Sequence, residues 1–274
     1  MQRSNGEHMG RVITITSGKG GVGKTTTTAN LGTALALQGG RVAVVDADIG
    51  LRNLDVVMGL ENRIVYDLVD VVEGRARLRQ ALIRDKRLPE LCLLPAAQTR
   101  DKDAVSREQM VELTEQLRRE FDFVLIDSPA GIENGFRNAI AGADEVIIVT
   151  TPEVSAVRDA DRIIGLVEAA EKGPPSLVVN RIKPRLVNRG EMLSVEDVLE
   201  LLAITLIGIV PDDETIVTST NRGEAAVYDH QSPAGRAFLD VARRLRGEEV
   251  PFPALQEQQG MLERFFGIFG RRRS

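Results

Sequence analysis

The sequence predicts an α/β fold with a doubly wound, mainly parallel sheet that has helices on both faces, followed by a C-terminal amphipathic helix. Three observations lead to this prediction. Apolar runs rich in Val and Ile alternate with helical patterns, and these runs are nearly continuous, as in strands that are covered on both faces. A glycine-rich turn joins the first strand to the first helix. With 274 residues, 43% of them hydrophobic, the chain is long enough to bury one large core.

The expected strands are short runs of branched apolar residues, and they cover residues 12–16, 41–46, 91–95, 121–127, 144–150, 176–180 and 206–211. The expected helices have regularly spaced apolar residues and few breakers, and they cover residues 24–37, 107–119, 156–170 and 195–202. Ligands of such sheets bind beyond the carboxyl ends of the strands. The polar motifs at those ends therefore form the candidate site.

The turn after the first strand is the strongest motif. It consists of Gly18, Lys19, Gly20, Gly21, Val22, Gly23, Lys24 and Thr25, and Thr26 follows. Glycines let successive amides converge on phosphates, and the helix adds its positive end. We expect Lys24 to reach the β- and γ-phosphates of a nucleotide, Thr25 to bind Mg²⁺ and Thr26 to contact the α-phosphate. A glycine-rich turn that binds nothing is the alternative, and the eight-position pattern between a strand and a helix argues against it.

Lys19 is unusual because an ordinary phosphate loop needs no lysine at this position. The loop resembles the deviant Walker A signature of the ParA/MinD/NifH superfamily. This resemblance implies that Lys19 reaches across a dimer interface to the nucleotide of the partner subunit. It therefore implies a homodimer that encloses ATP, with Lys19 and Lys24 as catalytic lysines.

Two carboxylates, Asp46 and Asp48, leave the end of the second expected strand. An Asp-rich surface turn is the alternative interpretation, which the nearby phosphate loop makes weaker. Phosphoryl transfer to water needs a group that orients the attacking water. We assign this catalytic role to Asp48, and we expect Asp46 to support either the Mg²⁺ shell or the loop itself.

Further strand ends complete the predicted site. Asp127 ends an apolar strand and is expected to hold Mg²⁺ through a water, as in a Walker B motif. Gly131 follows in a turn, and its amide is expected to face the γ-phosphate. The superfamily resemblance implies that Asn180 and the segment with Pro211 and Asp213 contact adenine.

Four segments narrow the resemblance to the MinD family of septum-site-determining ATPases: residues 46–55, 94–103, 127–133 and 153–159. The similarity runs from about residue 11 to the C-terminus, without a departure at the ATPase motifs. It implies Mg²⁺-dependent hydrolysis of ATP, recruitment of the division inhibitor MinC, and a topological regulator such as MinE. It also implies a cytoplasmic protein that lies on the inner face of the cell membrane in its ATP state, or a protein of the plastid stroma.

The C-terminus carries an independent signal. Six apolar residues fall on one side of a helical projection, and Arg271, Arg272 and Arg273 follow. The six are Met261, Leu262, Phe265, Phe266, Ile268 and Phe269. A helix that docks on its own domain is the alternative. Apolar residues beside arginines favour a helix that lies in the interface of an anionic membrane.

The composition argues against DNA coating, disulfides, metal sites other than Mg²⁺ and membrane-spanning segments. A net charge of −5 gives no general attraction for DNA. The single cysteine, Cys92, excludes an internal disulfide and argues against the bridging cluster of nitrogenase iron proteins; we expect it to be buried on a strand. His8 and His230 have no neighbouring Cys or His, so no metal other than Mg²⁺ is expected. No segment is long and apolar enough to span a bilayer, so we expect a soluble body.

We therefore divide the chain into four parts. Residues 1–10 form a flexible N-terminal segment or a remnant of cloning, residues 11–250 the P-loop ATPase domain, residues 251–259 a linker, and residues 260–274 the amphipathic membrane-targeting segment. Three alternative functions remain open: a ParA-type DNA partition ATPase, a MinD-like regulator of flagellar number, and a nucleotide-binding scaffold without useful hydrolysis. The Phe-rich C-terminus argues against the first of these.

Overall fold

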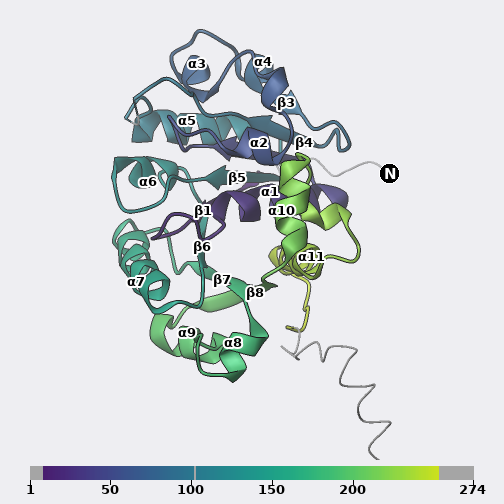
Figure 1. The fold of residues 1–274 in the computed structure, drawn as a ribbon. Helices are drawn as coiled ribbons and strands as arrows, with labels where there is room; N and C mark the ends of the chain where they lie inside the picture. Colours follow the sequence, from purple (N-terminus) through teal and green to yellow (C-terminus); the bar gives the residue numbers. More distant parts are fainter. Residues whose placement is uncertain (1–8, 102, 253–274) are drawn as a thin grey trace, which may run out of the picture.

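A computed structural model describes residues 9–101 and 103–252, which fold around one eight-stranded sheet (Figure 1). The strand order is β3-β4-β2-β5-β1-β6-β7-β8. The strands are β1 (Arg11–Thr16), β2 (Val42–Asp46), β3 (Ile83–Arg84), β4 (Leu91–Leu94), β5 (Phe123–Asp127), β6 (Glu145–Thr150), β7 (Ser176–Ile182) and β8 (Thr205–Pro211). All neighbours are parallel except β3, which pairs with β4 in the antiparallel sense. The predicted doubly wound, mainly parallel α/β fold is confirmed.

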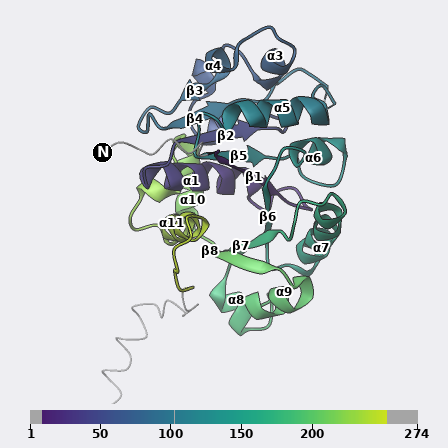
Figure 2. The ribbon, with the colours of Figure 1, turned by 180° about the vertical axis from the view of Figure 1, so that it is seen from behind.

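Helices cover both faces of the sheet (Figures 1 and 2). They are α1 (Lys24–Leu37), α2 (Leu54–Val57), α3 (Leu68–Val72), α4 (Leu78–Ala81), α5 (Arg107–Leu117), α6 (Asn134–Ala139), α7 (Val154–Ala169), α8 (Pro184–Asn188), α9 (Val195–Leu202), α10 (Glu214–Asn221) and α11 (Pro233–Leu245), with short 3-10 turns at Glu61–Arg63 and Ala226–Tyr228. Helices α1 and α11 share one hydrophobic core, whereas α5 packs in a second and α7 in a third.

Alternation along the strands produces these separate cores. Side chains of a strand point to opposite faces in turn. In β1, Ile13 and Ile15 join the core under α1 and α11, whereas Val12 joins the core under α5. All three are fully buried, as are Thr14 and Thr16, so both faces of this strand are covered.

The predicted element limits agree with the structure to within two residues, and the differences have local causes. The expected helix 107–119 ends at Leu117, because Arg118 is its C-cap. The expected strand 121–127 begins at Phe123, because the amides of Asp122 and Phe123 both bond to the carbonyl of Arg41 before the ladder starts. Cys92 is buried on β4, as expected.

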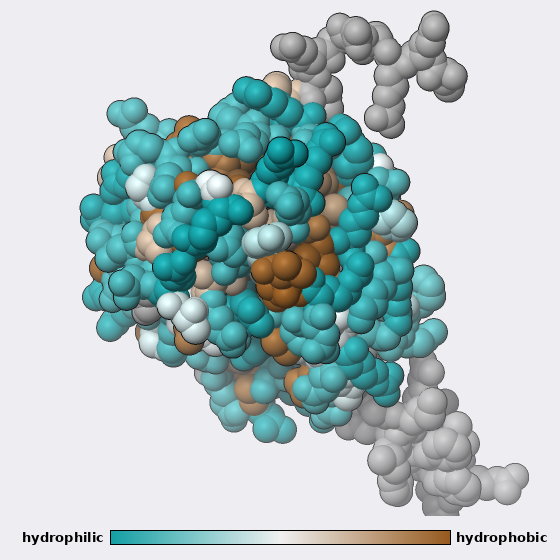
Figure 3. Space-filling model, turned by 90° about the horizontal axis from the view of Figure 1, so that it is seen from above, coloured by the Kyte–Doolittle hydropathy of each residue, from teal (hydrophilic) through white to brown (hydrophobic). Residues whose placement is uncertain are grey.

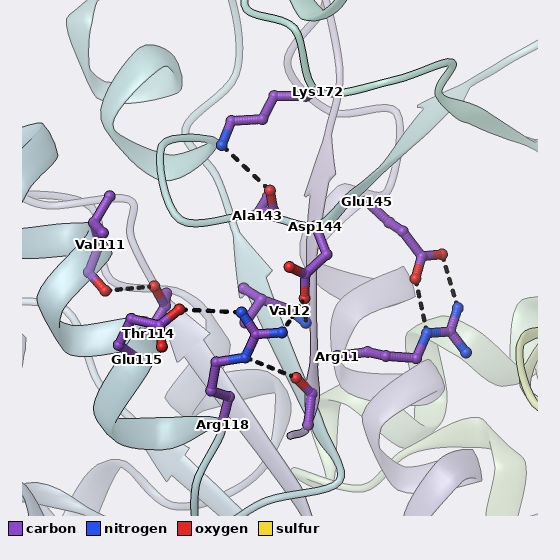
Figure 4. Close-up of polar contacts among 11 residues, drawn as sticks. Arg11, Val12, Val111, Thr114, Glu115, Arg118, Ala143, Asp144, Glu145 and Lys172 are labelled. Carbon is purple, nitrogen blue, oxygen red and sulfur yellow. Dashed lines mark hydrogen bonds and ion pairs between the residues drawn. The ribbon is translucent and has the colours of Figure 1, made fainter. Parts of the chain in front are cut away.

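Polar contacts hold the amino ends of the adjacent strands β1 and β6, on the side of the sheet opposite the predicted site (Figure 4). The Arg11 guanidinium forms a two-pronged pair with Glu145, with both N–O distances 2.7 Å. Asp144 accepts from the Val12 amide at 2.8 Å and from Arg118 at 3.1 Å. These contacts tie β1 to β6 and α5 without using any residue of the phosphate loop.

The face seen from the side that carries α3 and α4 is mainly hydrophilic, with a hydrophobic patch near its centre and smaller hydrophobic areas around it (Figure 3). Among the described residues, none of the helices is both long and apolar enough to cross a membrane. The predicted membrane segment, residues 260–274, lies outside the described residues, as does most of the linker before it.

Candidate functional site

The phosphate loop connects β1 to α1 and takes its shape from two glycines. Gly21 and Gly23 have φ angles of +79° and +96°, a region that side chains with a Cβ atom rarely adopt. Gly23 is the N-cap of α1, and neither a side-chain cap nor an acidic residue occupies the first turn. The amides at this helix start are therefore available to an anion, with the positive end of the helix behind them.

Lys24 is buried at the base of the loop, where its ammonium lies 2.8 Å from a carboxylate oxygen of Asp127. Thr28, one turn further along α1, contacts the same oxygen at 3.3 Å. Asp127 ends β5, the neighbour of β1 in the sheet, and this adjacency brings lysine and carboxylate together. The predicted Walker A lysine and Walker B aspartate thus form one buried pair. Sequence reasoning missed Thr28, although its position four residues after Lys24 places both on one side of the helix.

Asp46 is fully buried and organises the loop that follows β2. Its carboxylate accepts from the amides of Asp48, Asn53 and Leu54, at 3.0, 3.2 and 3.1 Å. Burial raises the pKa of Asp46 above its usual value, and the charge of Asp127 acts in the same direction, against the bonds from the amides. Of the two roles expected for Asp46, the structure shows support of the loop.

A second buried carboxylate, Asp55, lies in the first turn of α2, directly after this loop, and belongs to residues 46–55, one of the segments that resemble the MinD family. Asp55 is fully buried, and its nearest cation is Arg52, with Nε 3.0 Å from Oδ2. Arg52 reaches this position with a φ of +43°. The carbonyl of Asp48 accepts from the amide of Arg52. Arg52 is therefore bonded through its main chain to Asp48 and through its side chain to Asp55.

Asp48 has a different environment from Asp46, because it is only partly buried and lines a pocket of about 380 Å³. The pocket lies between the loops that follow β2 and β5, and Asp103, Pro129 and Glu133 also line it. Asp48 is thus placed beside solvent-accessible space at the carboxyl end of the sheet. This position suits a group that handles water.

The amide of Gly131 donates to the carbonyl of Ser17 at 3.1 Å. Gly131, with a φ of +95°, therefore lies against the start of the phosphate loop. In this structure its N–H is used by Ser17. A bond from this amide to a γ-phosphate requires that the contact with Ser17 open.

Lys19 points away from its own loop toward the start of α7. Its ammonium lies 3.0 Å from the hydroxyl of Ser155 and 4.0 Å from a carboxylate oxygen of Glu153. Its side chain remains 43% exposed. The two loop lysines thus differ sharply: Lys24 is buried at the sheet, and Lys19 lies at the surface. No pattern in the sequence predicts the contacts of Lys19 with the start of α7.

The residues expected to contact adenine form hydrogen bonds within the protein in this structure. Asn180 is buried on β7, and its amide donates to the carbonyl of Val22 at 2.8 Å. The carboxylate of Asp213 accepts from Thr215, Ser232 and Ala234, at 2.9, 2.6 and 3.1 Å, and so holds the starts of α10 and α11.

Pro211 ends β8 and is half-buried. Its pairing with Ile182 of β7 comes after an irregularity in the ladder of these two strands. Arg181, between Asn180 and Ile182, has a φ of +56°. The predicted base-contacting segments therefore start from two adjacent strand ends.

Comparison with known proteins agrees with this geometry. Residues 13–227 match the CobQ/CobB/MinD/ParA nucleotide binding domain. The septum site-determining protein MinD of Bacillus subtilis is 57% identical over 267 residues, which cover 96% of this chain and all of that protein. Among solved structures, MinD in the MinC:MinD cell division complex of Aquifex aeolicus has 52% identity and a TM-score of 0.84, covering 89% of this chain and 98% of that one. MinD of Pyrococcus horikoshii, complexed with Mg-ADP, has 32% identity and a TM-score of 0.77, with coverages of 86% and 96%.

Proposed function

Because the chain belongs to the MinD family of septum site-determining proteins, within the CobQ/CobB/MinD/ParA nucleotide-binding domains, we propose that it is an ATPase switch that positions the division septum. In its ATP state it dimerises, associates with the membrane and recruits a division inhibitor. The observation that carries this proposal is the buried pair of Lys24 and Asp127 beneath a glycine-rich loop whose helix start is uncapped. A relative with Mg-ADP supports the same ligands, ATP and Mg²⁺.

The residues present fit such a nucleotide. The loop amides would hold the phosphates, Lys24 would bind the β- and γ-phosphates, and Thr25 with Asp127 would hold Mg²⁺. Thr25 is partly exposed at the start of α1, next to Lys24. Bound Mg²⁺ would screen the negative charge of the phosphates.

Hydrolysis then needs a water beside the γ-phosphate. Asp48 orients this water and accepts its proton as the new bond to phosphorus forms and the bond to ADP breaks. Lys24 neutralises charge on the leaving phosphate oxygens. The products are ADP and inorganic phosphate. The partial exposure of Asp48 beside a pocket supports this assignment, whereas Asp46 is already engaged by three amides.

Dimerisation would use the carboxyl edge of the sheet. Lys19 lies at this edge with an exposed side chain, and it needs only to leave Ser155 and Glu153 to reach a second subunit. Three apolar residues at the same edge are at least half exposed: Leu51 and Ile132 on loops, and Val154 at the start of α7. Exposed apolar groups around a site are typical of a surface that becomes covered.

The structure of the Aquifex complex contains MinC with MinD, and we propose a MinC-like inhibitor as the partner of the ATP state. A topological regulator such as MinE would stimulate hydrolysis and return the protein to the cytoplasm. Residues 260–274 would supply the membrane contact. One short helix binds weakly, and two tethered helices gain about 10²–10⁴-fold in avidity, so dimerisation would control attachment.

Co-sedimentation with anionic vesicles tests the proposal. The full chain is incubated with ADP, ATP or a non-hydrolysable ATP analogue, and duplex DNA replaces the vesicles in a parallel series. We expect pelleting with vesicles in the triphosphate states only, and loss of pelleting when residues 261–269 are deleted. Retention on DNA without binding to vesicles would instead indicate a partition ATPase.

A further inference from the structure

The chain leaves the ATPase domain through a short segment after α11, residues 247–252, which we call the exit segment. Gly247, with a φ of +85°, terminates the helix. Its amide donates to the carbonyl of Arg244 at 2.9 Å, and the amide of Glu248 donates to the carbonyl of Arg243 at 3.1 Å. This is the Schellman arrangement, which reverses the chain at a helix end. The exit segment therefore folds back past the last turn of α11 instead of continuing away from it.

Arg244 holds the reversed segment in place. Its Nε donates to the carbonyl of Val250 at 3.0 Å, and one terminal nitrogen donates to the carbonyl of Pro251 at 2.9 Å. Its guanidinium carbon lies 4.0 Å from the ring centre of Phe252, which stacks on it. Three consecutive residues of the exit segment thus contact one side chain.

The same side chain is fixed to the sheet. The other terminal nitrogen of Arg244 donates to the carbonyl of Ile207 in β8 at 3.0 Å. Since β8 is the last strand in the sheet order, Arg244 connects the exit segment to an edge of the rigid core. A planar guanidinium can donate in these separate directions at once, whereas a lysine ammonium cannot match this geometry.

We propose that Arg244 is a positioning residue that fixes where the membrane-targeting tail leaves the ATPase domain, and that it thereby strengthens membrane attachment of the dimer. This inference rests on the proposed function. With Arg244 in place, seven residues, 253–259, lie between the held exit segment and residue 260. Without it, Gly247 and Glu248 are still held by their bonds to α11, so eleven residues, 249–259, separate the last held residue from residue 260.

The difference in linker length determines how much the affinity for the membrane is expected to change. The effective concentration of a tethered group falls as roughly the −3/2 power of linker length, so lengthening from seven to eleven residues lowers it about 2-fold. The second tail of a dimer would then bind the membrane about 2-fold less well. The effect concerns attachment only, because Arg244 contacts no residue of the nucleotide site among the described residues.

The test compares three variants of the full chain. Arg244→Gln and Arg244→Lys both remove the directional bonds, but only the first removes the charge. Arg246→Gln is the matched control, because Arg246 is exposed at the same helix end and its side chain has no partner among the described residues. Melting temperature and ATPase activity without vesicles check that each variant folds.

Mobility of the exit segment is measured first, with a nitroxide on Glu249→Cys. Glu249 is exposed, and the natural Cys92 is buried and so shielded from the label. We expect an immobilised label in the parent and in Arg246→Gln, and a mobile label in both Arg244 variants. Equal mobility in all four proteins would overturn the role of Arg244.

Binding to anionic vesicles with a non-hydrolysable ATP analogue is measured next. We expect an apparent affinity about 2-fold lower in both Arg244 variants. A normal affinity in Arg244→Lys would show that charge alone acts, and equal or tighter binding in both variants would also overturn the inference. If the parent itself fails to bind vesicles, the proposed function fails, whereas the label mobility still decides whether Arg244 holds the segment.

An insertion keeps the test valid if the Arg244 variants do not fold. Four Gly/Ser residues placed after Phe252 give the same length of eleven residues before residue 260 while every contact of Arg244 is retained. We expect this variant to lose affinity for vesicles by the same factor of about 2, with an immobilised label. An unchanged affinity would contradict the length argument.

Discussion

The side-chain amide of Asn180 donates a hydrogen bond of 2.8 Å to the main-chain carbonyl of Val22, so β7 holds the middle of the phosphate loop from two strands away. The same side chain limits what can follow Val22. A Cβ atom at Gly23 would lie 2.3 Å from its nitrogen. The conformation of the loop is therefore set jointly by its glycines and by a distant strand.

Replacing Asn180 with Ala should weaken binding of both ADP and GDP about 10-fold, because a buried bond worth roughly 1–1.5 kcal/mol no longer holds the loop. Isothermal titration calorimetry measures both affinities. Exposed Asn188→Ala on α8 is the control. A selective loss of ADP binding would mean that Asn180 acts as a base contact, and unchanged affinities would refute both roles.

Truncation of the two lysines of the phosphate loop should affect the free energy of unfolding very differently. Lys24→Ala leaves Asp127 buried without its cation, which costs about 3–5 kcal/mol and lowers the melting temperature by roughly 6–20 °C. Lys19→Ala removes an exposed contact and should change unfolding free energy by less than about 1 kcal/mol. Calorimetric melting of both variants without nucleotide distinguishes them. Similar melting temperatures would show that the Lys24 pair adds no stability.

Replacing the two aspartates Asp46 and Asp48 should have different effects, one on the stability of the fold and the other on the rate of ATP hydrolysis. Asp48→Ala is expected to lower the rate of ATP hydrolysis about 10²–10⁴-fold while melting temperature and ATP affinity stay near those of the parent. Asp46→Ala should instead destabilise the fold, because three amides lose their buried acceptor. Phosphate release and thermal melting are measured on both. Full activity in Asp48→Ala would remove that residue from the mechanism.

The free energy of unfolding should depend on pH because the carboxyl group of Asp213 is ionised in the folded protein. Burial alone would raise the pKa of this carboxyl, but bonds from Ser232, Thr215 and Ala234 outweigh it and lower the pKa below the usual 3.8. A lowered pKa in the folded state means that the contribution is complete above about pH 4 and is lost as the pH falls through the folded pKa.

Accordingly, Asp213→Asn should reduce the free energy of unfolding by about 1–2 kcal/mol at pH 7, and the difference from the parent should shrink below about pH 4. Urea unfolding at several pH values measures it. Neighbouring Asp212→Asn is the control, since Asp212 is exposed and pairs only with a half-exposed Lys183 at 3.4 Å. A difference that is independent of pH would rule out the charge of Asp213 as the cause.

The sequence predicted those elements whose signal is local. Helix α1 begins and ends where expected, because the glycine turn precedes it and the apolar spacing is regular. The short helices α2, α3 and α4 and the two-residue strand β3 were not predicted, since four or five residues carry no measurable periodicity. Helix α11 was also not predicted, although Ser232 as N-cap and Pro233 at its first turn are local signals that would have found it.

For the site, the sequence identified the strand ends and their carboxylates, but not their partners. The pairing of Lys24 with Asp127 depends on β1 and β5 being neighbours, and the strand order does not follow the chain order. Likewise, the contact of Lys19 with Ser155 joins residues 136 positions apart. Such contacts depend on topology, which residue patterns leave undetermined.

The two edges of the sheet differ in what they could offer another chain. At one edge, β3 has two residues; at the other, the Ile207 carbonyl of β8 is already bonded to Arg244. Long, flat, unpaired edges are where sheets of different molecules join and aggregate. In the proposed function, copies of the chain gather on a membrane, where crowding would raise the rate of wrong encounters along with the right one. A two-residue edge strand and a bonded edge carbonyl would disfavour the wrong encounters, and the proposed dimer would form instead at the carboxyl ends of the strands.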